Sequence, residues 1–205
     1  PGGGGGPRVA GDLTASGVIY EGTGYGRVQA THDVLVSESP SGTLDVLNEG
    51  GIYGTARVKT AFALEQPVLT LTDLTASALG LTASGNVTAN LDGPLAEGEL
   101  AFSTRDLRGL RAVTGTPLSG RAKGRVMLSA PGGRQDAVLD LTANGLATDG
   151  VRISTARLRA TLRDLLGTLV IDTSLNATGA VSGDATIDMA SVTARGPLSR
   201  LALTV

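Results

Sequence analysis

Asp172 is the first residue to test for chemistry, because it lies in the tetrapeptide Ile171-Asp-Thr-Ser174. Asp-Thr-Ser resembles the loop that carries the catalytic aspartate in aspartic proteases. The mechanism of those enzymes needs two carboxylates that share one proton. A second copy or a dimer would be required here. Asp172 also continues the polar side of an alternating strand that runs on through Leu175. We interpret Asp172 as a strand residue and expect no catalytic role for it.

His32 is the only histidine, and it precedes Asp33. A catalytic triad also needs a nucleophile on a strained turn, and no Gly-x-Ser-x-Gly sequence is present. One histidine without cysteine does not make a zinc site. We expect His32 to be a solvated strand or loop residue, and the chain to have no catalytic residue, no metal and no cofactor.

The glycines of Gly22-Thr-Gly-Tyr-Gly26 have the density of a phosphate-binding loop. Such a loop needs a helix after it, whereas residues 27–31 alternate as a strand. Asp149 and Asp184 lie at turns, but the nonapeptide of calcium-binding β-rolls is absent. Turn glycines and solvated turn aspartates are the expected interpretation.

Arg105, Arg108 and Arg111, together with Arg121 and Arg125, form the one basic cluster. The first three have helical spacing, which allows a single helical turn. The cluster is interpreted either as a contact for anionic lipid head groups or as a solvated face.

The composition excludes several classes of protein. The chain has 205 residues with 17 basic and 19 acidic side chains, so nothing indicates a nucleic-acid partner. It has no cysteine for disulfides, and only 2% of its residues are aromatic. Its 30 glycines and many small polar residues favour short strands joined by turns. We expect residues 1–10 to be a flexible glycine-rich lead and residues 11–205 to be a repetitive β region from a longer protein.

Alternation of apolar and polar residues is the main structural signal. In residues 81–91, Leu81, Val87 and Leu91 lie on one side, and Asn86 lies on the other. Similar runs cover residues 68–72, 137–144, 151–155, 169–178, 185–189 and 201–205. Residues 155–167 fit a helix or a strand, and the strand is favoured because both neighbours are strands. Asp149-Gly150 is the best hairpin turn.

A turn followed by a strand recurs at Gly93-Pro-Leu and Gly196-Pro-Leu, and more loosely at Thr116-Pro-Leu. Repeated strands with this punctuation, rich in Leu, Thr, Ala and Gly and poor in rings, resemble the β-rich region of the TamB family of AsmA-like bacterial envelope proteins. Residues 81–102, 136–155 and 169–205 carry the resemblance, which covers most of residues 60–205; the first 60 residues match less well.

The resemblance implies a periplasmic segment of a protein anchored in the inner membrane, with a sheet curled into a half-pipe. It further implies outer-membrane assembly with a TamA-type barrel, and shelter of phospholipid acyl chains or unfolded outer-membrane protein strands in an apolar groove.

We therefore expect an all-β, elongated, mainly antiparallel sheet, curled with its apolar face inward. The alternative is a surface or secreted β-repeat protein, an adhesin or autotransporter passenger, with a closed core. If the basic cluster contacts head groups, Arg105, Arg108 and Arg111 are the residues that would do so; the solvated face remains the alternative. The residues expected to line the groove are Leu69, Leu71, Leu81, Val87, Leu91, Leu139, Leu141, Leu158, Leu162, Leu169, Ile171, Leu175 and Ile187.

Overall fold

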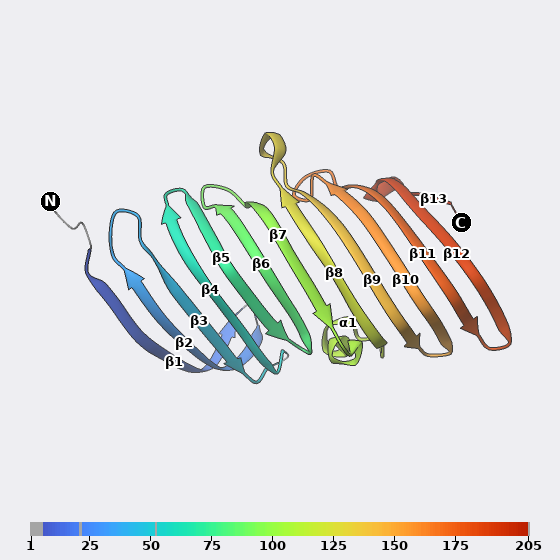
Figure 1. Cartoon of the computed structure of the whole chain (residues 1–205), viewed down its shortest axis with the longest axis horizontal. Helices are drawn as coiled ribbons and strands as arrows, with labels where there is room; N and C mark the ends of the chain where they lie inside the picture. Colours follow the sequence, from blue (N-terminus) through green and yellow to red (C-terminus); the bar gives the residue numbers. More distant parts are fainter. Residues whose placement is uncertain (1–5, 21, 52, 205) are drawn as a thin grey trace. The chain divides into compact units, whose positions relative to one another are not determined.

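The computed structural model describes residues 6–20, 22–51 and 53–204, and it divides into two compact units. Unit 1 covers Pro1–Pro94 and unit 2 covers Leu95–Val205. Within each unit, every strand pairs antiparallel with the next strand in the sequence (Figure 1). The prediction of an all-β, mainly antiparallel fold is confirmed.

Unit 1 is a meander of six strands. They are β1 (Arg8–Tyr20), β2 (Thr23–Leu35), β3 (Ser41–Glu49), β4 (Thr55–Glu65), β5 (Val68–Ala78) and β6 (Leu81–Asn90). The first strand thus begins at Arg8, inside the expected glycine-rich lead, and residues 1–5 of that lead lie outside the described residues.

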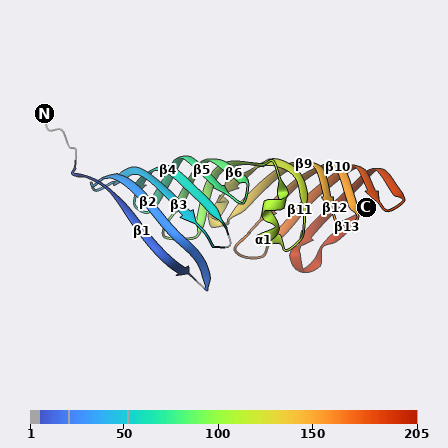
Figure 2. The ribbon, with the colours of Figure 1, turned by 90° about the horizontal axis from the view of Figure 1, so that it is seen from below.

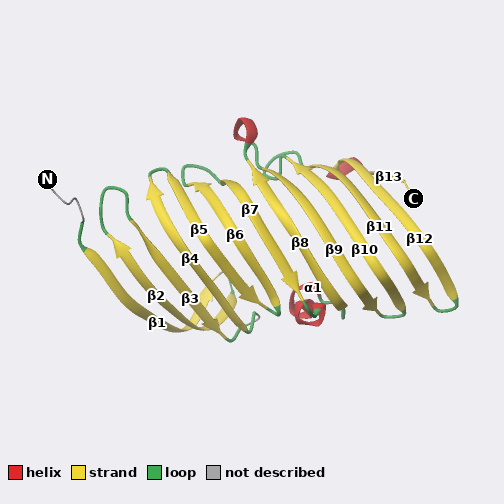
Figure 3. Ribbon diagram, in the orientation of Figure 1, coloured by secondary structure: helices red, strands yellow, loops and turns green. Residues whose placement is uncertain are grey.

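Unit 2 is a meander of seven strands with short helical segments at strand ends (red in Figure 3). Its strands are β7 (Leu95–Thr104), β8 (Ser119–Ser129), β9 (Asp136–Thr148), β10 (Val151–Arg163), β11 (Val170–Ser182), β12 (Ala185–Pro197) and β13 (Ala202–Thr204). The helical segments are the 3-10 helices η1 (Leu107–Leu110), η2 (Pro131–Gly133) and η3 (Leu198–Arg200) and the single turn α1 (Arg111–Thr114).

Left-handed glycines bend the first hairpin. Gly17 on β1 and Gly26 on β2 have φ of 68° and 71°, values that other residues rarely adopt. The β1–β2 register shifts between Ser16 and Ile19. The far end of the hairpin turns back behind the sheet in Figure 1, and it projects from the other strands of the unit in Figure 2.

A β-bulge in β5 keeps the apolar side chains of this strand on one face of the sheet. The register of β5 shifts between Leu71 and Leu74, where Asp73 has φ of 51°. The Asp73 N–H donates to Asn86 Oδ1 at 3.0 Å, so a side chain replaces the lost ladder bond. The extra residue returns the apolar side chains of β5 to the face they occupied before the bulge.

The fold shows which secondary structure is formed by the ambiguous residues 155–167 and by the segment around Arg108. Of the ambiguous residues 155–167, residues 155–163 belong to β10, as favoured, because they lie between β9 and β11 and pair with both, whereas residues 164–167 follow the strand as a turn. The helical turn expected near Arg108 is present as η1 and α1.

Asp149-Gly150, the expected hairpin turn, joins β9 to β10 as a two-residue turn, with Gly150 at φ of 77°. The Gly196-Pro-Leu copy differs from the Gly93-Pro-Leu copy, since Gly196 and Pro197 end β12 and the 3-10 helix η3 follows.

No helix within the described residues is long and apolar enough to cross a bilayer.

Candidate functional site

Apolar residues of unit 2 lie directly opposite one another across six strands. The row through Leu141 contains Phe102, Gly124, Leu141, Leu158, Leu175 and Val192. The neighbouring rows contain Leu100, Val126, Leu139, Ala160, Thr173 and Ala194; Gly98, Leu128, Ala137, Leu162, Ile171 and Gly196; and Thr104, Ala122, Ala143, Ala156, Ala177 and Ala190. Because alternate residues of a strand share a face, these four rows form one face, the apolar face of unit 2.

Unit 1 has the same arrangement on one face of its sheet. One row contains Val9, Val34, Gly42, Phe62, Leu71 and Val87, and another contains Leu13, Ala30, Val46, Val58, Ala76 and Ala83. Leu64, Leu69 and Ala89 form a shorter row beside them. We call this the apolar face of unit 1.

The large side chains of these faces remain partly exposed. Among the described residues, the buried hydrophobic side chains are Leu107 and five alanines, so no strand Leu, Ile, Val or Phe is fully covered. Leu13 is 64% exposed and Leu175 is 37% exposed. The accessible surface of the chain is 12950 Å². Two separate compact proteins of half this mass would together expose only about 10,700 Å², so the chain exposes more surface than compact folding would leave.

Most residues expected to line a groove lie on these faces. Leu69, Leu71, Leu81 and Val87 lie on the apolar face of unit 1, and Leu139, Leu141, Leu158, Leu162, Ile171 and Leu175 lie on that of unit 2.

Three expected lining residues lie elsewhere. Leu91 follows the last residue of β6, where a turn begins, and it is 57% exposed. Leu169 precedes β11, and its carbonyl accepts a hydrogen bond from the Leu198 N–H at 3.0 Å. Ile187 pairs with Ala180 in a separate row, beyond the left-handed Gly179. The alternation extends past the strand in the first two cases and is interrupted by the glycine in the third.

The opposite face of unit 2, its polar face, carries charges paired across strands. Asp140 on β9 lies between two arginines, with Oδ2 at 3.5 Å from Arg125 Nε and Oδ1 at 3.2 Å from Arg159 Nε. Asp172 on β11 lies 3.0 Å from Arg195 Nε on β12. The interpretation of Asp172 as a strand residue therefore agrees with an ion pair on an exposed face, and Arg125 of the basic cluster already has an acidic partner.

The polar face of unit 1 has a similar pair at Asp45. Its carboxylate accepts hydrogen bonds from Arg57 Nε at 2.8 Å and Nη2 at 2.6 Å, and Lys59 Nζ lies at 2.9 Å. The Arg57 bonds lower the pKa of Asp45 well below its ordinary value; partial burial opposes this shift, and Lys59 adds to it.

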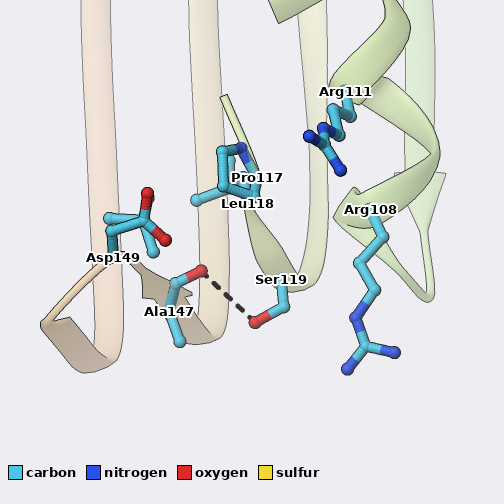
Figure 4. Close-up of a pocket in the computed structure, with 8 residues that line it drawn as sticks. Arg108, Arg111, Pro117, Leu118, Ser119, Ala147 and Asp149 are labelled. Atoms are coloured by element: carbon cyan, nitrogen blue, oxygen red, sulfur yellow. Dashed lines mark hydrogen bonds between the residues drawn. The ribbon is translucent and has the colours of Figure 1, made fainter. Parts of the chain in front are cut away.

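The basic cluster of the sequence is divided between two pockets. Arg108 and Arg111 line a pocket of about 450 Å³ at the strand ends, with Asp149 on its other side (Figure 4). Ser119 donates to the Ala147 carbonyl at 3.3 Å within it. Arg105 instead lines a second pocket with Arg121 and Lys123.

His32 and possible metal ligands are the remaining candidates from the sequence. His32 lies on β2 opposite Leu44, in a row with Gly11 and Thr60 on the apolar face of unit 1. It is half-buried, which corrects the expectation of a solvated residue. Within the ranges that the structure describes, no group of three or more His, Cys, Asp or Glu side chains is placed to hold a metal ion.

Gln135 is a residue that the sequence did not single out. It is 6% exposed, and its amide binds the backbone of β7: Oε1 accepts from the Ala96 N–H at 2.6 Å, and Nε2 donates to the Ala96 carbonyl at 2.9 Å. Nε2 also lies 3.1 Å from the carbonyls of Ser129 and Asp136. The side chain thus replaces a strand partner at the start of β7. A lone polar residue after a Pro-Gly-Gly turn gives no sequence signal for this role.

Comparison with known proteins gives no relative: no protein-family model, no curated protein and no solved structure matches the chain.

Proposed function

We propose that the apolar faces of the two units bind the acyl chains of lipid, without catalysis, as a segment of a TamB-like periplasmic protein. The observation that carries this proposal is the partial exposure of every large strand side chain in the apolar rows. Apolar surface left in water costs about 25 cal/mol per Å², so a guest that covers it is bound favourably.

The chemistry of the rows favours an aliphatic guest. They consist mainly of Leu, Val, Ile, Ala and Gly, with one phenylalanine in each unit, and Thr104 and Thr173 are the polar members of the unit 2 rows. Such a surface has few polar groups to orient a rigid ligand, whereas a flexible hydrocarbon chain needs only continuous apolar contact. Curling of each sheet about its apolar face, as a half-pipe, would increase this contact.

The resemblance to the TamB family adds the cellular setting to the proposal. In that setting the parent protein is anchored in the inner membrane, the segment lies in the periplasm, and a TamA-type barrel is the outer-membrane partner. Arg108 and Arg111, beside the pocket at the strand ends, would contact lipid head groups. Unfolded outer-membrane protein strands are the other guest of this setting.

The proposal is tested with photo-crosslinking amino acids at neighbouring positions of opposite faces. Val87 and Ile171 lie on apolar faces, and Asn86 and Asp172 are their adjacent residues on the polar faces. The 205-residue chain carrying one crosslinker is incubated with phospholipid vesicles, irradiated and analysed by intact mass. Lipid adducts are expected at positions 87 and 171.

The matched positions 86 and 172 are expected to give little adduct. Equal labelling at all four positions, or none at any of them, would overturn the proposal. Labelling at positions 87 and 171 by an unfolded outer-membrane protein, but not by lipid, would replace the acyl chain by a protein strand as the guest.

A further inference from the structure

A pocket of about 350 Å³ lies where β7 ends and β8 passes beside it. It is lined by Ser103, Thr104, Arg105, Arg121, Ala122, Lys123 and Asn144. Ser103 lies opposite Lys123, and Arg121 lies opposite Asn144, so these four side chains share the polar face of unit 2. The charged and amide side chains of the pocket therefore belong to the polar face, while Thr104 and Ala122, which also line it, belong to an apolar row.

The pocket brings together hydrogen-bond donors and three positive charges. Arg105, Arg121 and Lys123 are exposed cations, and no acidic residue is among the lining residues. Asn144 Oδ1 accepts from the Thr155 hydroxyl at 3.3 Å. This bond directs the carboxamide so that its NH2 group remains as a donor.

Several cations of the sheet faces lie beside an aspartate on the neighbouring strand, as Arg57 does beside Asp45 and Arg195 beside Asp172. Other strand cations, Arg152, Arg157 and Arg163 on β10, form no ion pair with a described residue, but they do not line one pocket together as Arg105, Arg121 and Lys123 do. Within the described part of the chain, neither Arg121 nor Lys123 forms an ion pair, although they are two residues apart on one face. Adjacent like charges repel, so this arrangement costs stability unless an anion occupies the pocket.

The net charge of unit 2 is positive, which also favours an anionic ligand. Unit 1 has four basic and nine acidic residues, a net charge of −5, and unit 2 has thirteen basic and ten acidic residues, a net charge of +3. Six of these basic residues and a single acidic one, Asp106, fall within residues 105–125. The Asp106 carboxylate accepts from the Arg108 backbone N–H at the start of η1 and lies 3.9 Å from Arg108 Nε, and Asp106 is not among the residues that line the pocket.

We propose that Arg105, Arg121, Lys123 and Asn144 form a binding site for a phosphate group. Guanidinium, ammonium and amide N–H groups that converge without an acidic neighbour match the oxygens of a phosphate better than a single carboxylate. The volume accommodates a phosphate with part of the molecule that carries it. The site lies on the polar face and does not depend on guest binding at the apolar faces.

The phosphate has two sources, a soluble phosphate compound or the head group of an anionic lipid, and two probes distinguish them. Inorganic phosphate is titrated at constant ionic strength while the Asn144 side-chain amide is followed by NMR. In parallel, the chain is mixed with phosphatidylcholine vesicles that contain or lack phosphatidylglycerol, and cosedimentation is measured.

Two variants of equal net charge make the test specific. The pocket variant is Arg105→Gln, Arg121→Gln and Lys123→Gln, and the control is Arg134→Gln, Arg163→Gln and Arg200→Gln, all in unit 2. Lys123→Gln alone is expected to weaken binding about tenfold, the effect of one charge-assisted hydrogen bond. The pocket variant is expected to lose binding, and the control to keep it.

Each outcome decides the proposal. A shift of the Asn144 amide with inorganic phosphate, lost only in the pocket variant, supports a site for soluble phosphate. Cosedimentation only with phosphatidylglycerol, lost only in the pocket variant, supports a head-group site. Equal losses in the two triple variants would show general electrostatic attraction, and no binding of either probe would show an empty site; both results overturn the proposal.

Discussion

The Phe102 ring on β7 lies over Gly124, the residue directly opposite it on β8. A Cβ atom added at Gly124 would be 2.7 Å from Phe102 Cζ and 2.3 Å from the Asp140 carbonyl oxygen. Phe62, the only other phenylalanine of the chain, also lies opposite a glycine, Gly42. In unit 2, the bare backbone of Gly124 thus gives room for a large ring in a row of small side chains, whereas a Cβ atom at Gly42 would first meet the backbone of Asp33 and Val34.

Gly124→Ala is expected to lower the free energy of unfolding by about 1–3 kcal/mol, because the new methyl group overlaps the backbone of β9. Gly93→Ala is the control, since a Cβ there meets nothing within 4 Å. Urea denaturation of both variants measures the difference. Equal stability of the two variants would contradict the close approach at Gly124.

Acid is expected to weaken the Asp45–Arg57 pair. The pKa of Asp45 is lower in the folded chain than in the unfolded chain, so the pair stabilises the fold above about pH 4. That contribution decreases as the pH falls from about 4 through the lowered pKa. Thermal denaturation between neutral and acidic pH should show a smaller acid-induced decrease in Tm for Asp45→Asn than for the unchanged chain. Asp184→Asn, on the β11–β12 turn, is the comparison and should leave the pH dependence unchanged.

Gln135→Glu is expected to destabilise unit 2 by about 2–3 kcal/mol. The substitution removes the Nε2 donor and places a carboxylate oxygen against the carbonyls of Ala96, Ser129 and Asp136. Gln29→Glu, on a half-buried strand position, is the matched control. Hydrogen exchange at the Ala96 amide should become faster in Gln135→Glu alone; unchanged protection there would contradict the bridging role.

Gly145 on β9 separates the effect of backbone conformation from that of space. Its φ is 61°, and a Cβ there meets nothing within 4 Å. Gly145→Val is expected to cost about 1–2 kcal/mol from the left-handed backbone alone. Gly145→Asn should cost less, because asparagine tolerates this conformation. Chemical denaturation measures the stability of both variants. A less stable Gly145→Asn than Gly145→Val would show that the left-handed φ does not set the cost of substitution at this position.

Local patterns predicted many of the strands from residue 68 onward, but they did not single out β1, β3 or β4. The alternation around Leu141 and Ile171 identified their shared apolar side, because the period of two is a property of each strand by itself. The pattern of residues 155–167 fits both a helix and a strand, and only pairing with β9 and β11 selects the strand for residues 155–163. Leu91 and Ile187 were placed wrongly, because alternation does not mark where a strand ends, as at Leu91, or where a left-handed glycine in the neighbouring strand interrupts a row, as Gly179 on β11 does beside Ile187.

The sequence by itself determined many of the strands after residue 67, several turns and the alternation of polar and apolar side chains along those strands, because backbone alternation and turn chemistry act over a few residues. The tertiary structure alone decided which residues are neighbours across strands: Phe102 with Gly124, Asp140 between Arg125 and Arg159, and Arg105 with Lys123 in one pocket. The register between strands depends on bulges and glycines in both partners, so these contacts between residues distant in the sequence arise only when the sheet has formed.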